Sequence, residues 1–77
     1  MHNELNINNT EEAHAFGAVA TPDQIKKLKE LRTHFKNEAK QVAKIGTEEA
    51  MNDAMFHMAN AQFMREALET AGYIVND

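Results

Sequence analysis

The sequence predicts an all-α fold, in which two long antiparallel helices form a hairpin behind a short N-terminal arm. Apolar residues recur every three or four positions over most of the chain, as on the face of a packed helix. The 77 residues include one proline and three glycines, too few turn-forming residues for a β-rich fold. Two of the glycines, Gly46 and Gly72, follow long helical patterns and are expected to end them.

Residues 1–20 are expected to form a flexible arm with a short helix, in which residues 1–9 are mobile and residues 10–20 can fold back over the hairpin. Thr10 is a capping residue, and the two glutamates that follow it favour a helix over about residues 11–16. That helix offers only Ala13 and Phe16 for burial, so it would not be stable alone.

The helical domain of residues 21–77 begins with a helix over about residues 22–45. Thr21 and Gln24 have the spacing of a capping box, and Pro22 stands at the first helical position, where proline is favoured. The apolar side chains form a single stripe, which one neighbouring helix can cover. The stripe consists of Ile25, Leu28, Leu31, Phe35, Ala39 and Val42.

The second long helix is expected over about residues 47–71. Thr47 caps it, and Glu48 and Glu49 follow in its first turn, at the positive end of the helix dipole. Because the connection at Gly46 is so short, the two long helices are expected to run antiparallel.

The second helix carries apolar residues on two faces, more than one neighbouring helix can cover. The first face consists of Ala50, Met51, Ala54, Met55, Met58, Ala61 and Leu68. The second face consists of Phe56, Phe63, Met64, Ala67 and Ala71. Either the N-terminal arm or a second copy of the chain covers the second face. We favour the second copy, because Phe16 and Val19 offer little apolar area, and predict a dimer that forms a four-helix bundle.

Charge is divided unevenly between the two long helices. The net charge is −4, yet seven of the eight basic residues lie between Gln24 and Ile45. Five of them share one side of the first helix: Lys29, Arg32, Lys36, Lys40 and Lys44. They pair with acids of the second helix, as Lys40 with Asp53, contact a polyanion such as nucleic acid, or bind an acidic protein partner. No tryptophan or tyrosine is interleaved for base stacking. A helix-turn-helix is excluded, because phosphates would repel the acidic start of the second helix.

The sequence contains no catalytic signature and no cofactor motif. It has no cysteine and no glycine-rich phosphate loop, so we expect no enzyme and no cofactor. Glu30 with His34, and Asp53 with His57, have i, i+4 spacing, whereas helical two-metal sites use Glu-x-x-His. We interpret both pairs as exposed contacts and expect no metal.

These patterns favour a small interaction protein that regulates, adapts or inhibits a larger partner, a role that phages and mobile elements often give to chains of this size. Flexible thioethers suit irregular partners, so the predicted interface is Met51, Met55, Phe56, Met58, Phe63 and Met64. The alternatives are a nucleic-acid-associated dimer and a structural subunit of an assembly. No apolar run approaches the roughly 18 residues of a membrane span, so we expect a cytoplasmic protein without a membrane partner.

Overall fold

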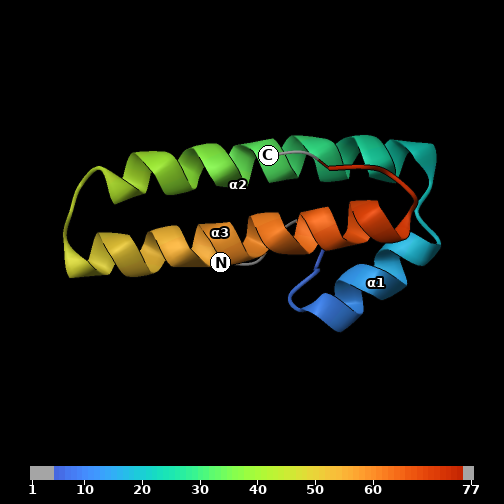
Figure 1. Cartoon of the computed structure of the whole chain (residues 1–77), viewed down its shortest axis with the longest axis horizontal. Helices are drawn as coiled ribbons and strands as arrows, with labels where there is room; N and C mark the ends of the chain where they lie inside the picture. Colours follow the sequence, from blue (N-terminus) through green and yellow to red (C-terminus); the bar gives the residue numbers. More distant parts are fainter. Residues whose placement is uncertain (1–4, 76–77) are drawn as a thin grey trace.

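The computed structural model describes residues 5–75, which form three helices and no strand. The helices are α1 (Thr10–Ala18), α2 (Pro22–Ala43) and α3 (Glu48–Thr70). This confirms the predicted all-α class. Helices α2 and α3 lie side by side and run in opposite directions, and α1 packs near the C-terminal end of α3 (Figure 1).

The ends of α2 and α3 follow the capping signals of the sequence. The Gln24 N–H donates to the Thr21 hydroxyl at 3.3 Å, and the Thr21 N–H donates to the Gln24 side chain at 2.8 Å, which completes the capping box. The Ala50 N–H donates to the Thr47 hydroxyl at 3.1 Å. Gly46 and Gly72 have φ angles of 80° and 98°, a left-handed conformation that glycine adopts at little cost. Each long helix ends within two residues of its predicted bound.

Helix α1 is longer than predicted and has a different cap. It spans Thr10–Ala18, and Asn9 rather than Thr10 is the N-cap. The Asn9 side chain accepts a hydrogen bond of 2.8 Å from the Glu12 N–H. Glu12 in turn accepts a bond of 2.9 Å from the Asn8 N–H. Two hydrogen bonds of Glu12, one to Asn9 and one from Asn8, therefore fix the start of a helix that has few large apolar residues.

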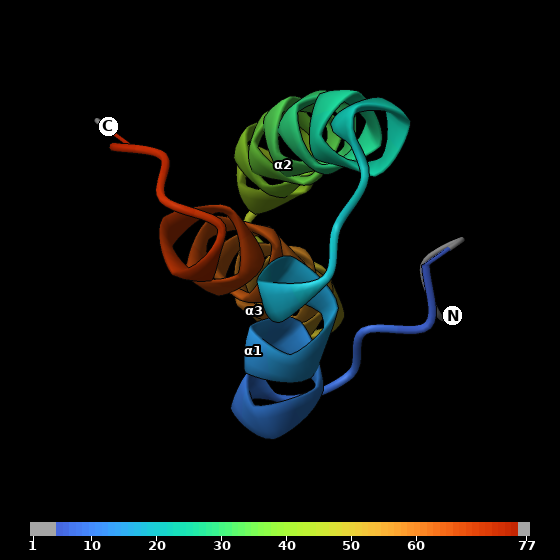
Figure 2. The ribbon, with the colours of Figure 1, turned by 90° about the vertical axis from the view of Figure 1, so that its right-hand side faces the viewer.

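Helix α3 lies between α1 and α2 and packs against both (Figure 2). The α2 side of the core is the predicted stripe, since five of its six residues are buried and Val42 is half-buried. The largest fully buried side chains are those of Ile7, Leu28 and Met64. One continuous core cluster joins the three helices: Ile7, Ala13, Ile25, Leu28, Leu31, Phe35, Ala61, Met64, Ala67 and Leu68.

The N-terminal segment is packed against the core: residues 10–20 fold back over the hairpin, as the sequence analysis allowed, and the burial of Ile7 differs from the mobility expected for residues 1–9, of which residues 1–4 lie outside the described part. Ile7 is 1% exposed and belongs to the core cluster. Gly17 lies against the α3 backbone, where a Cβ atom would clash with the Ala67 carbonyl oxygen. The sequence estimate relied on the area of apolar side chains. The actual contact comes from close backbone approach and from a residue that precedes the helix.

Among residues 5–75, no helix is both long enough and apolar enough to cross a membrane.

Candidate functional site: a groove between α2 and α3

A groove of about 640 Å³ lies between α2 and α3, near the loop that joins them. Its α2 wall consists of Ala39, Lys40 and Ala43, and its α3 wall consists of Met51, Ala54, Met55, Met58 and Ala59. We call this surface the methionine groove. Met55 is 68% exposed, and Met51 and Met58 are about half exposed. Three large thioether side chains of this chain therefore have water-exposed surface on one wall.

Small residues in this part of the interhelical contact create the groove. Next to the loop, the buried positions are Ala39, Ala50 and Ala54, none of which belongs to the core cluster. Toward α1, Leu28 and Phe35 fill the corresponding space. Because alanine side chains are small, the alanines form the floor of the groove, and the longer side chains of Lys40 and the methionines form its walls.

A second pocket of about 270 Å³ continues the methionine groove toward α1, because Met58 lines both. Its lining combines two cations of α2 with one of α3, and we call it the basic pocket: Arg32, Lys36, Met58, Ala61, Gln62 and Arg65. Arg65 also forms an exposed ion pair with Glu69 at 3.7 Å. Pairs of this kind are weak and exchange readily with competing ions. The groove thus changes from apolar to cationic along its length.

The C-terminal segment borders the far end of this surface. A third pocket shares Arg32 with the basic pocket and is lined by Tyr73, Ile74 and Val75. The Lys29 ammonium lies 4.6 Å from the centre of the Tyr73 ring, within the range of a cation–π contact. The tail therefore adjoins the basic pocket at the end away from the loop.

The structure brings together two sets of residues that the sequence analysis treated separately. Met51, Met55 and Met58 form one wall, and Arg32, Lys36 and Lys40 border the other. Of the remaining cations in the predicted stripe, Lys29 contacts the tail and Lys44 caps the end of α2. A turn of 100° per residue places these cations and methionines at the edges of their helices. Which cation lies beside which methionine follows only from the alignment of α2 with α3.

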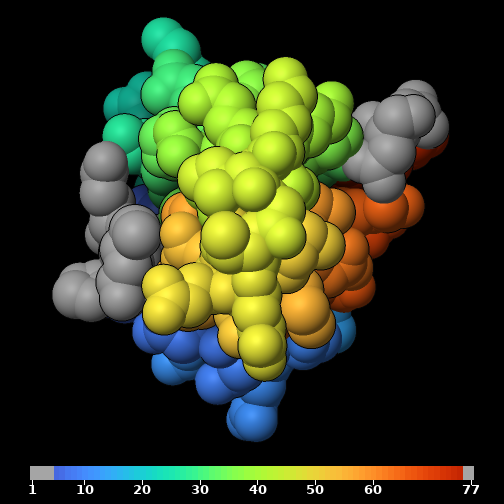
Figure 3. Space-filling model, turned by 90° about the vertical axis from the view of Figure 1, so that its left-hand side faces the viewer, coloured from blue at the N-terminus to red at the C-terminus, as the bar shows by residue number. Residues whose placement is uncertain are grey.

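The phenylalanines predicted for the interface lie outside the groove. Phe56 is five residues after Met51, which turns it about 140° around α3. It is 40% exposed and lines a separate hollow of about 690 Å³ with Val42 and Ile45, near the loop that faces the viewer in Figure 3. Phe63 is half-buried. Met64, expected on the partner-binding surface, is 0% exposed, because it belongs to the core that α1 helps to close.

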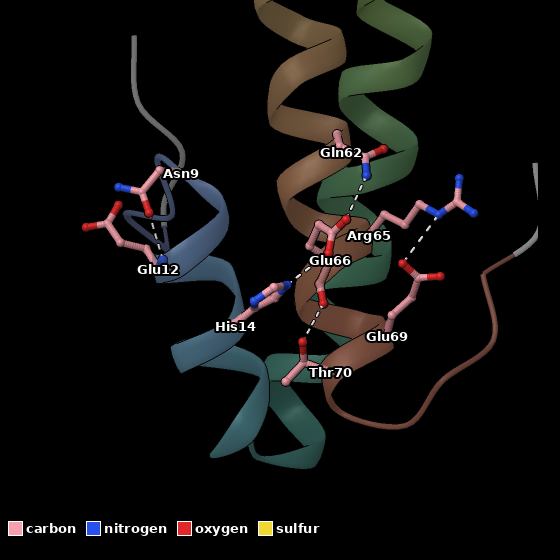
Figure 4. Close-up of polar contacts among 8 residues, drawn as sticks. All are labelled: Asn9, Glu12, His14, Gln62, Arg65, Glu66, Glu69 and Thr70. Atoms are coloured by element: carbon pink, nitrogen blue, oxygen red, sulfur yellow. Dashed lines mark hydrogen bonds and ion pairs between the residues drawn. The ribbon is translucent and has the colours of Figure 1, made fainter.

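Glu66 links α1 to α3 through a polar cluster (Figure 4). Its carboxylate is 2.9 Å from His14 Nε2 and accepts a bond of 3.0 Å from the Gln62 amide. The hydrogen bond with His14 lowers the pKa of Glu66 most; the Gln62 bond and the charges of His14 and Arg65 lower it further, while desolvation opposes them. The ionised carboxylate therefore favours the docked position of α1.

His57 is buried, contrary to the expectation of an exposed pair with Asp53. It is 4% exposed and stacks on Phe35 with 6.1 Å between ring centres. Its Nε2 is 3.8 Å from the Asp53 carboxylate, and its Nδ1 has no hydrogen-bond partner. Among residues 5–75, no three His, Asp or Glu side chains are grouped as metal ligands.

Comparison with known proteins returns no match among family models, curated proteins or solved structures.

Proposed function

We propose that this protein is a non-enzymatic interaction module that docks a helical segment of a larger protein in the methionine groove. The observation that carries this proposal is the exposure of Met51, Met55 and Met58 on one wall of an interhelical groove. Binding would regulate, adapt or inhibit the partner.

The residue types in the groove suit this mode of binding. An amphipathic helix that docks in a groove presents apolar anchors at positions i, i+3, i+4 and i+7. Methionine is unbranched and polarisable, so it adapts to anchors of different shape. Alanines on the floor leave room for those anchors between the walls.

The sequence suggested that Lys40 pairs with Asp53 of α3. Lys40 borders the methionine groove, whereas Asp53 lines the Phe56 hollow on the other side of α3. The predicted Lys40–Asp53 pair is therefore wrong, and Lys40 is better explained as part of the binding surface.

A display experiment with a library of helical peptides tests the docking mode. We expect enrichment of peptides with the i, i+3, i+4, i+7 apolar pattern. Met55→Glu should weaken their binding more than tenfold, because it places an unpaired charge in the contact. Val19→Glu is the matched control, since Val19 is 79% exposed and does not line the groove. Failure to enrich any helical peptide, or equal binding by Met55→Glu, would contradict the proposal.

Self-association into a four-helix bundle is a second candidate, favoured by the exposed Phe56 and Ile45 at the loop end. A second copy would bury this hollow and leave the methionine groove open. Light scattering on Phe56→Glu and the unmodified chain tests it: a dimer that the substitution dissociates supports this contact, and a monomeric unmodified chain contradicts it.

A further inference from the structure

We infer that the segment bound in the groove is an amphipathic helix that carries carboxylates at one end, and that these carboxylates enter the basic pocket. This inference rests on the proposed function and adds the chemistry and the register of the partner. Its basis is the continuity of the methionine groove with a pocket that contains Arg32, Lys36 and Arg65.

The spacing of the two parts defines the partner. Met51, Met58 and Arg65 follow each other at intervals of seven residues on α3, which correspond to about 10 Å each along the helix axis. A docked helix of similar length therefore places two turns of apolar anchors beside the methionines. Its next two turns lie beside the cations.

The positive charges of the basic pocket favour negative charge on the two turns of the docked helix that lie beside them. Cations from two different helices converge on a lining that is otherwise made of Met58, Ala61 and Gln62. Guanidinium groups bind carboxylates in a planar, two-bond geometry that an ammonium cannot reproduce. An acidic group at this position gains charge-assisted hydrogen bonds, whereas a basic one is repelled.

A second copy of the chain does not match this surface. A symmetric contact through the groove would bring two copies of the basic pocket, each with Arg32, Lys36 and Arg65, into one interface. The surface therefore favours a separate acidic segment.

Synthetic helical peptides of about 16 residues test the inference with the full chain. All share the same apolar anchors. The first pair compares two glutamates with two glutamines on the docking side of the last two turns. The second pair makes the same comparison in the first two turns, so that both directions of binding are tested. Fluorescence anisotropy should show that one acidic peptide binds about tenfold more tightly than its glutamine counterpart, with the advantage declining as salt is added.

A charge-matched pair of variants isolates the pocket. Arg32→Gln with Lys36→Gln should bring the acidic peptide to the affinity of the neutral one. Lys26→Gln with Lys44→Gln removes the same charge from exposed positions outside the pocket and should keep most of the advantage. Circular dichroism of each variant checks that helix content is unchanged.

The possible failures are distinguishable. Equal binding of acidic and neutral peptides, each sensitive to Met55→Glu, would overturn this inference and leave the docking function in place. No binding by any peptide would overturn both. A DNA duplex that binds more tightly than the acidic peptides, independently of Met55→Glu, would assign the cations to nucleic acid. A dimer that Met55→Glu dissociates would assign the groove to a second copy; either result overturns the inference.

Discussion

The two ends of the α2–α3 pair differ in what fills the contact between the helices. Toward α1, large side chains such as Leu28, Phe35 and Met64 interlock, and α1 covers the outer side of α3 (Figure 2). Toward the loop, alanines occupy the buried positions, while Met55 and Phe56 remain in contact with water. The same two helices thus provide a packed core at one end and an exposed apolar surface at the other.

This difference indicates that one half of the helix pair provides the stability of the fold and the other half provides the binding surface. A domain of this size has a small free energy of unfolding, so it cannot lose much of its core. Concentrating the large side chains at one end allows the other end to keep apolar groups exposed for binding. Stability and binding should therefore respond to substitutions in different halves.

The strongest way to break this comparison is to truncate one residue in each half. Leu28→Ala removes a fully buried side chain and should lower the free energy of unfolding by about 2–5 kcal/mol. Met55→Ala should change it by less than about 0.5 kcal/mol, because Met55 is largely exposed. Urea denaturation followed by circular dichroism measures both. Similar losses in the two variants would show that the loop end contributes to the core.

Gly17→Ala tests whether close backbone contact holds α1 against α3. The added Cβ would clash with the Ala67 carbonyl, and we expect a loss of about 1–3 kcal/mol. Alanine favours the helix over glycine by about 1 kcal/mol, so a loss cannot arise from helix propensity. Urea denaturation gives the stability, and hydrogen exchange should show faster exchange in α1. An unchanged or more stable variant would contradict the close contact.

His57 lies between the two halves, and its replacement should raise stability. His57→Phe removes a buried Nδ1 that has no partner while it keeps an aromatic ring against Phe35. We expect a gain of about 1 kcal/mol, because a buried polar group without a hydrogen bond is costly. Thermal unfolding at neutral pH measures the change. A marked loss would indicate that His57 makes a polar contact essential to the fold.

The smallest expected effect is a pH dependence at the α1 contact. Because the pKa of Glu66 is lowered from its ordinary value of 4.5, the ionised carboxylate stabilises the folded chain above that pH. The contribution is lost as the pH falls through the lower pKa of the folded state. Thermal midpoints of the unmodified chain and Glu66→Gln should therefore differ at pH 6 and converge toward pH 3. Glu30→Gln removes the same charge from an exposed position of α2 away from the α1 contact and is the control.

The sequence predicted the elements of the fold better than their packing. Local signals fixed the helix ends, because the Thr21–Gln24 capping box and the glycines at positions 46 and 72 act within a few residues. The position of α1 depends on contacts with residues about 50 positions away, such as His14 with Glu66. No local pattern contains that information, and the apolar area of Phe16 and Val19 was a misleading guide.

The sequence identified the methionines and the cations of the candidate site but did not show that they border the same groove. Met51, Met55 and Met58 were placed on the first apolar face of the second helix together with the alanines that meet α2, since they lie within the same broad arc. A helix contact is narrower than that arc, so Met51 and Met55 lie at its exposed edge. His57 was expected in solvent, yet it is buried, with its ring against Phe35 of α2. Which cations border the methionines follows only from the pairing of α2 with α3.

The exposure of the groove methionines also determines how the chain responds to peroxide. Thioethers in contact with water are oxidised to sulfoxides, which are polar, whereas buried ones are protected. Met51, Met55 and Met58 should therefore be modified before Met64, in an order that mass spectrometry of peptide fragments can follow. Mild oxidation would convert the apolar wall into a polar one while the core at the other end stays intact. The groove would thus lose its affinity for apolar anchors without unfolding, and methionine sulfoxide reductases would restore it.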